Sequence, residues 1–135
     1  MTTEKDLLEY AQEKYESRGH DPEDKPIFSI LLFEHPDKMH MIVNKDGEEE
    51  PSGFPDTGDQ YEVGFYYDLK TAIEVLNSNV CDIQEGCYNA AFILCKFQGL
   101  YIGCNMHERM YFVWDPVCRG FFQQEEPKIF KHIAY

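Results

Sequence analysis

Apolar positions along the chain follow two kinds of spacing, one typical of helices and one typical of strands. Near the start, Leu7, Leu8, Ala11 and Tyr15 recur at intervals of three and four residues, which predicts an amphipathic helix. Thr3 stands at the head of an approximate capping box, so we expect the helix to begin there.

A second helical stretch follows Asp68, which is a favourable N-cap residue. Its apolar stripe consists of Leu69, Ala72, Ile73 and Leu76. Apolar runs elsewhere predict strands at Ile27–Phe33, Met39–Val43, Tyr61–Tyr67, Tyr88–Phe97, Tyr111–Asp115 and Phe121–Gln124, with a short return strand at Leu100–Ile102. A Pro-Asp pair separates the first two strands, which predicts a hairpin between them.

The order of these elements indicates an α+β fold. Strands that follow one another through short turns favour an antiparallel sheet, and the helices are expected to pack mainly on one face of it. A short terminal helix after Pro127 is expected to turn Ile129, Phe130 and Ile133 inward. A length of 135 residues is typical of one domain, so we expect residues 1–135 to form a single acidic domain.

Residues 44–60 lack a clear periodic pattern. The segment holds two prolines and three glycines among several acids, so we expect a long acidic loop. Loops of this length are uncommon within compact domains and are often functional.

Charge sharpens this picture because it is unevenly distributed. The net charge is −13, and residues 1–67 hold 17 acids against 6 bases, whereas residues 68–135 hold 8 against 6. Such a field repels phosphates and anionic lipid, so we expect neither direct nucleic-acid binding nor membrane binding. It favours a protein partner with a basic surface, including a nucleic-acid-binding effector. A plain role in solubility is the alternative, and the oligomeric state stays open.

The five cysteines are odd in number, and no secretory apolar segment precedes them. We therefore expect reduced thiols in a cytoplasmic protein, and no disulfide. No motif for a phosphate or a dinucleotide is present, and we expect no cofactor.

Two groups of acids suggest a partner-binding surface, because acids on a folded surface can imitate the phosphates of a nucleic acid. One group lies along the first helix and the other lies in the acidic loop. The candidate partner-binding residues are Glu9, Glu13, Glu16, Glu48, Glu49, Glu50, Asp56 and Asp59. A solvated charged face explains the same pattern and stays open as the alternative.

A rival interpretation is a small enzyme or a ligand-binding protein. Its pocket would lie around Cys87, Cys104 and His107, with the Cys87 thiol as nucleophile and either His107 or His40 as base. Cys104 and His107 also have the spacing of a zinc-ligand pair. No local signature fixes either geometry, so we assign no catalytic residue and no metal ligand.

Aromatic residues gather in the second half, where 11 of the 20 lie in residues 88–135. Alternation along Tyr111–Asp115 places Tyr111 and Val113 on one face, and Phe112 and Trp114 on the other. One face is expected to be core. The hairpin at residues 111–122 is therefore either core on both faces or a binding surface on one.

Residues 66–135 resemble a group of short proteins encoded on phages and conjugative elements of gut Firmicutes. The resemblance rests on a Tyr-Asp-Leu-Lys motif at 67–70, a Cys-Asp-Ile motif at 81–83 and a Gly-Phe-Phe motif at 120–122. It covers about half of the chain and carries no known catalytic residue. It implies cargo of a mobile element, and favours a non-enzymatic counter-defence protein such as an anti-CRISPR inhibitor of a host effector.

Overall fold

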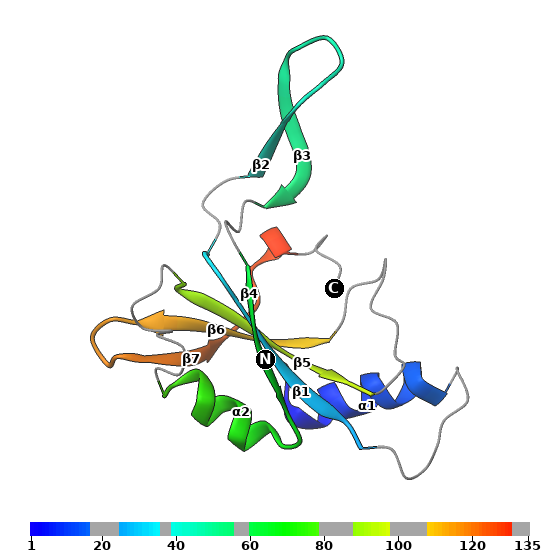
Figure 1. The fold of residues 1–135 in the computed structure, drawn as a ribbon, viewed down its shortest axis with the longest axis vertical. Coiled ribbons are helices and arrows are strands. Elements are labelled where there is room, and N and C mark those ends of the chain that lie inside the picture. The colour runs from blue at the N-terminus through cyan, green and yellow to red at the C-terminus, as the bar shows by residue number, and fades with distance from the viewer. Residues whose placement is uncertain (17–24, 36–38, 56–59, 79–87, 98–107, 131–135) are drawn as a thin grey trace.

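The computed structural model describes residues 1–16, 25–35, 39–55, 60–78, 88–97 and 108–130. Its elements form a five-stranded antiparallel sheet in the order β4-β1-β5-β6-β7, and a separate two-stranded sheet of β2 and β3 (Figure 1). The bounds are α1 Glu4–Glu16, β1 Ile27–Phe33, β2 Met39–Val43, β3 Glu49–Pro55, β4 Tyr61–Tyr66, α2 Leu69–Leu76, β5 Ala90–Lys96, β6 Arg109–Asp115, β7 Gly120–Gln124 and the 3-10 helix η2 Lys128–Phe130. The predicted α+β class with an antiparallel sheet is confirmed.

The central strand β5 of the five-stranded sheet is buried on both faces, and alternation divides its residues between two cores. In β5, Ala91, Ile93 and Cys95 contribute to one core, while Phe92 and Leu94 contribute to the other. Side chains of α1 and α2 complete the first core, which confirms that the helices pack on one face. Burial on both faces explains why this strand reads as one continuous apolar run.

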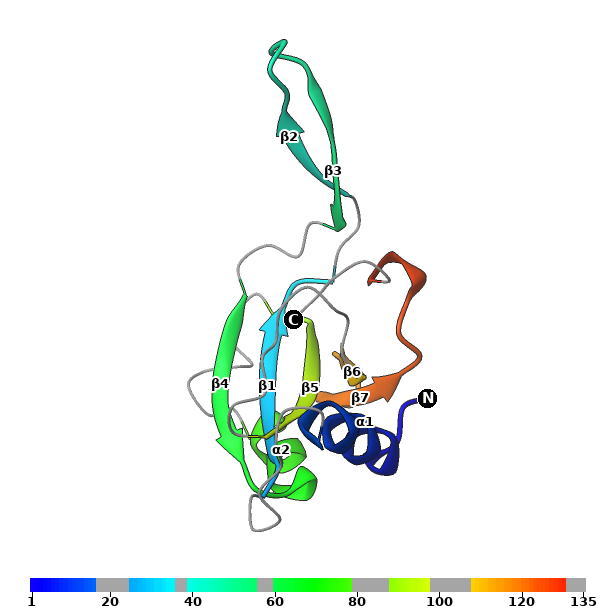
Figure 2. The same ribbon diagram turned by 90° about the vertical axis from the view of Figure 1, so that its right-hand side faces the viewer.

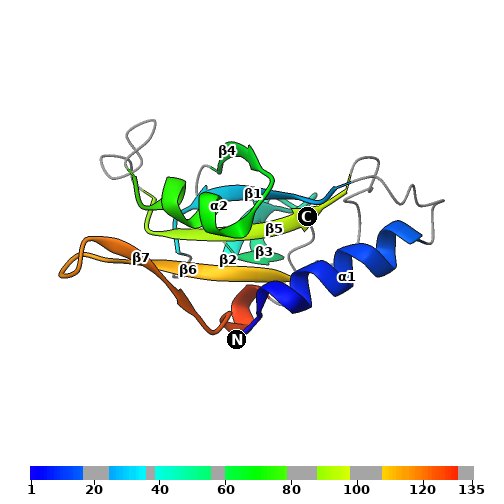
Figure 3. The same ribbon diagram turned by 90° about the horizontal axis from the view of Figure 1, so that it is seen from below.

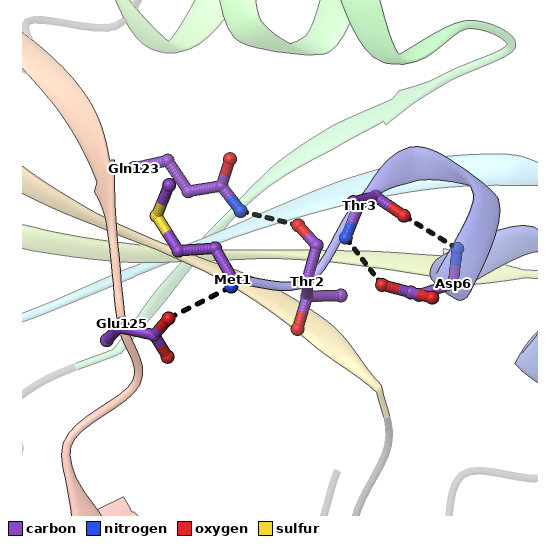
Figure 4. A network of polar contacts seen from close by, with 6 residues as sticks. All are labelled: Met1, Thr2, Thr3, Asp6, Gln123 and Glu125. Atoms are coloured by element: carbon purple, nitrogen blue, oxygen red, sulfur yellow. Dashed lines mark hydrogen bonds and ion pairs between the residues drawn. The ribbon is translucent and has the colours of Figure 1, made fainter.

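Polar caps begin both helices where the sequence predicts them. The backbone N–H of Thr3 donates to Asp6 Oδ2 at 2.9 Å, and the Asp6 N–H donates back to Thr3 Oγ1 at 3.2 Å (Figure 4). Asp68 caps α2 by accepting from the Thr71 N–H at 2.7 Å. These hydrogen bonds lower the pKa of both aspartates, because they stabilise the ionised carboxylate.

The residues before α1 contact residues at the end of β7. The Met1 amine lies 2.9 Å from Glu125 Oε1, and Gln123 Nε2 donates to the Thr2 carbonyl at 2.6 Å (Figure 4). The start of α1 is thereby held beside the end of β7. Both helices lie at the end of the sheet that Figure 3 views from below.

The second core is closed by η2 and contains a buried ion pair. Phe130 is fully buried against Phe33 and Phe92, with ring centroids 5.5 and 5.3 Å apart. The Arg109 side chain has no exposed surface, pairs with Glu126, donates to the Phe130 carbonyl at 3.0 Å and lies 4.1 Å from the Phe92 ring centroid. Phe130 therefore packs inward as predicted, while the side chain of Ile129 and residue Ile133 lie outside what the structure describes.

Two predictions about residues 39–60 are wrong. β2 pairs with β3 and does not form a hairpin with β1, whose neighbours are β4 and β5. Residues 49–55, expected within a long acidic loop, form a strand despite Pro51 and Pro55. In a two-stranded ribbon each strand has a free edge, where a proline without an N–H is tolerated. The short strand predicted at 100–102 lies outside the described residues.

Candidate functional site

A two-stranded hairpin projects from the rest of the molecule. It consists of β2, the turn at residues 44–48 and β3, and we call residues 39–55 the finger. Figures 1 and 2 show it extending away from the five-stranded sheet, on the side opposite α1 and α2. The remaining elements are called the body. The side chains of residues 41–43 and 45–51 of the finger are all exposed.

The turn of the finger is ordered by its own hydrogen bonds. Asn44 Oδ1 accepts from the N–H groups of Asp46 and Glu48 at 2.9 and 3.0 Å, and the Asn44 N–H donates to the Glu48 carbonyl at 2.8 Å. Gly47 has a φ of 81°, which is a left-handed conformation that glycine adopts without strain. A turn with a glycine in this position is a common three-residue hairpin connection. It fixes the register of the two strands.

The finger exposes apolar side chains on both of its faces. Met41, Ile42 and Val43 are 44%, 41% and 69% exposed. Successive residues of a strand point to opposite faces, so Met41 and Val43 share one face and Ile42 lies on the other. Contiguous exposed apolar residues of this kind mark interaction surfaces more often than isolated ones.

Carboxylates lie directly opposite these apolar residues. Glu49 pairs in register with Val43, and Glu50 pairs with Ile42. Glu48 precedes them at the end of the turn, and all three side chains are exposed. With four acids against Lys45, the finger has a net charge of −3. The three predicted partner-binding glutamates thus lie together on an ordered projection.

The acids of α1 do not join this group. Glu9 and Glu13 are exposed on α1, which lies at the end of the molecule away from the finger (Figure 2). Glu9 is also 3.7 Å from Lys5 Nζ in an exposed ion pair. Glu16 is placed as the last residue of α1 by its backbone alone, and Asp56 and Asp59 lie outside the described residues. The finger and the helix are therefore two separate acidic surfaces.

The sequence analysis predicts the apolar strand of the finger but not its exposure. The run Met39–Val43 was predicted as a strand that pairs with Ile27–Phe33, although the segment after it holds three consecutive glutamates and then proline and glycine. That following segment offers few apolar residues with which to bury a strand. The sequence signal for exposure is therefore an apolar strand followed by a segment that is too polar to cover it.

The aromatic hairpin at 111–122 is mainly core. Tyr111 and Phe112 are buried in the two different cores, Trp114 is partly buried against the first, and its ring centroid lies 5.2 Å from that of Phe121. Phe122 is 47% exposed. It lines an open groove of about 520 Å³ together with Val113, Trp114, Asp115, Pro116, Cys118 and Gln124.

The Asp115 carboxylate at this groove is occupied by hydrogen bonds within the turn. Asp115 Oδ1 accepts from the N–H groups of Val117 and Cys118 at 2.8 and 3.3 Å, which lowers the pKa of Asp115. The carboxylate is thus held in its ionised form as a structural cap. The groove offers a largely apolar surface and no converging set of catalytic groups among its lining residues.

The pocket of the rival interpretation lies outside the described residues. Cys87, Cys104 and His107 all lie in segments that the structure does not describe. Within the described segments, Cys95 and Cys118 are free, and no group of three or more His, Cys, Asp or Glu side chains is placed to hold a metal ion. Burial raises the pKa of the Cys95 thiol to about 12, so this thiol is not a nucleophile at neutral pH.

Neither a membrane-spanning helix nor a known relative adds to the description of this site. Among the described residues, no helix is both long and apolar enough to cross a membrane. The finger is identified as the candidate site from its geometry alone. No protein-family model, curated protein or solved structure matches the chain.

Proposed function

We propose that this chain is a non-enzymatic binding protein that docks on a basic protein surface through its finger. The observation that carries the proposal is the joint exposure of Met41, Ile42 and Val43 beside Glu49 and Glu50 on a projecting hairpin. Apolar residues contribute affinity when they are buried by a partner, and the carboxylates select a partner of opposite charge.

The charge of the whole chain supports the same partner. A net charge of −13 raises the rate of encounter with a basic surface and repels acidic ones. The ordered turn lowers the entropy that is lost on binding, because its backbone is already fixed by Asn44 and Gly47.

We further propose that the partner is a host defence effector that handles nucleic acid, and that docking inhibits it. Such effectors carry basic surfaces, to which the finger is electrostatically complementary. The resemblance of residues 66–135 to proteins of phages and conjugative elements supports an anti-CRISPR role. An inhibitor of this kind acts in the cytoplasm, in keeping with the free thiols of Cys95 and Cys118.

Binding is tested with two variants that each remove three negative charges. The finger variant carries Glu48→Gln, Glu49→Gln and Glu50→Gln, and the matched helix variant carries Glu9→Gln, Glu13→Gln and Glu16→Gln. Each tagged protein captures partners from a soluble extract of a gut Firmicutes strain at low and at physiological salt. We expect the finger variant to lose at least about tenfold in capture and the helix variant to lose little. Equal capture by the wild type and the finger variant would contradict the proposal.

Inhibition is measured separately in cells. Expression of the chain in a strain with an active CRISPR system should restore establishment of a plasmid that the system targets. The helix variant should restore it as well, and the finger variant should not. Binding without restoration would retain the docking function and remove the inhibitory one.

A further inference from the structure

The finger differs from an ordinary docking surface because the described side chains near its turn are exposed on both of its faces. Met41 and Val43 lie on one face with Glu49, and Ile42 lies on the other with Glu50. Besides the pairing of its own strands, the main contact of the finger with the described body is between β3 and η2. The apolar residues near the turn are therefore exposed to solvent on two opposite sides.

A flat partner surface would bury only one of these sides. Docking by the Val43 face would leave Ile42 exposed in the complex, and docking by the Ile42 face would leave Met41 and Val43 exposed. Burial of both faces needs two partner walls that lie on either side of the ribbon. A ribbon of two strands is one strand layer thick, and packed layers are about 10 Å apart, so the walls are about 20 Å apart from centre to centre.

We propose that the finger inserts into a cleft of its protein partner, with apolar residues and Lys or Arg residues side by side on both walls. This inference rests on the proposed function and specifies the partner surface. Charge complementarity places basic residues on the walls and at the floor of the cleft, because each face presents its own glutamate at the level of the apolar residues, and Glu48 adds a third carboxylate at the turn. A second copy of the chain is an unfavourable occupant, since its net charge is also −13.

The turn has the properties that insertion requires. It enters the cleft first, and its backbone is closed by the Asn44 N–H to Glu48 carbonyl bond at 2.8 Å and the Gly47 N–H to Asn44 carbonyl bond at 3.0 Å. These N–H groups are therefore satisfied within the finger and need no partner in the cleft. A Cβ atom added at Gly47 would meet no atom within 4 Å. The glycine is therefore required for the backbone conformation of the turn and not for close packing.

Site-specific photo-crosslinking tests the two walls. The full chain carries p-benzoylphenylalanine at position 42 in one sample and at position 43 in another, and the control carries it at position 117, where Val117 is 88% exposed on the body. The probe is the purified protein that the wild-type chain captures. We expect positions 42 and 43 to crosslink to two separate segments of that protein, each near Lys or Arg residues, and position 117 to crosslink to neither.

Affinity measurements give an independent readout on the same purified protein. Ile42→Ser and Val43→Ser should each weaken binding by about tenfold, because each removes one buried apolar side chain from a different wall. Melting curves of the free variants should match the wild type, since both side chains are exposed.

The outcomes separate this inference from the proposed function. Loss of crosslinking and affinity at one of the two positions alone, with the effect of the glutamate variant retained, means docking on a flat surface and overturns the cleft. A crosslink to a second copy of the chain overturns it as well. Absence of any effect at 42, 43 and the three glutamates rejects both proposals.

Discussion

Phe92 and Ile93 are neighbours in β5 and both are fully buried, whereas Ile42 and Val43 are neighbours in β2 and both are exposed. The strand residues are of the same kind, but their surroundings differ. β5 has a strand on each side and a core on each face, while β2 has one neighbour and no core. A two-stranded hairpin alone is marginally stable in water, so the finger depends on its turn for order.

This contrast separates residues that stabilise the fold from residues that are available to a partner. In the body, apolar side chains contribute to the free energy of unfolding, because folding removes them from water. In the finger, the corresponding free energy is realised only when a partner covers the side chains. Changes in the body should therefore alter stability, and changes in the finger should alter binding.

The largest effect on stability is expected at Phe92. Its ring contacts Phe33, Tyr111 and Phe130, and Phe92→Ala should lower the free energy of unfolding by about 3–5 kcal/mol. The matched change Val43→Ala in the finger should cost less than about 0.5 kcal/mol. Urea denaturation measures both. Similar losses for the two variants would remove the distinction between body and finger.

A smaller loss is expected on breaking the buried ion pair. Glu126→Gln leaves the Arg109 charge without its carboxylate, and should cost about 3 kcal/mol, the lower end of the range for buried pairs because Glu126 is partly exposed. Glu125→Gln is the control, since Glu125 pairs with the Met1 amine at an exposed position and should cost less than about 1 kcal/mol. Equal melting temperatures for the two variants would contradict this account of the second core.

Tyr111 should respond to pH. Its hydroxyl is buried and has no hydrogen-bond partner among the described residues, so Tyr111→Phe should leave stability at pH 7 unchanged or raise it by about 1 kcal/mol. Burial and the nearby Glu126 raise the pKa of Tyr111 from 10.0 to about 12. Because the unfolded chain releases this proton first, the stability that the neutral form contributes is complete below pH 10 and is lost as the pH rises toward 12.

Denaturation at pH 8 and pH 11 checks this prediction. Tyr111→Phe should reduce the loss of stability between the two values. Cys95, whose pKa is also raised to about 12 by burial, adds to the loss in the same direction and remains in both proteins. An equal loss with and without the hydroxyl would mean that Tyr111 titrates normally in the folded state.

Only a small effect on stability is expected from removing the finger itself. Replacing residues 40–54 by a short Gly-Ser linker should change the free energy of unfolding of the body by less than about 1 kcal/mol, because the side chains of residues 41–43 and 45–51 are all exposed. Thermal melting followed by circular dichroism measures it. A loss of several kcal/mol would show that the finger belongs to the folding unit.

Periodicity predicted the body well because local pattern and tertiary burial agree there. The caps at Thr3 and Asp68, the strand at Ala90–Lys96 and the opposite faces of Tyr111 and Phe112 all follow from spacing. Strand pairing was less predictable. Met39–Val43 was assigned to Ile27–Phe33 because the two are adjacent in sequence, but non-local pairing with β4 and β5 prevailed.

The candidate site was predicted in part. Glu48, Glu49 and Glu50 were identified from charge alone, which needs no knowledge of the fold. The exposure of Ile42 and Val43 was not, because the apolar run alone has the same pattern in a buried and in a projecting strand, and only the polar segment after it distinguishes the two. Asn44 and Gly47 are the local signal for the turn that pairs this strand with the polar segment after it.

The central claim is that the finger carries partner binding and the body carries the fold. Its most direct test is the affinity of the chain without residues 40–54 for the purified captured protein, measured by calorimetry at physiological salt. The account predicts a folded chain with wild-type melting behaviour that binds at least about 100-fold more weakly. A folded chain without its finger that binds as tightly as the wild type would contradict it.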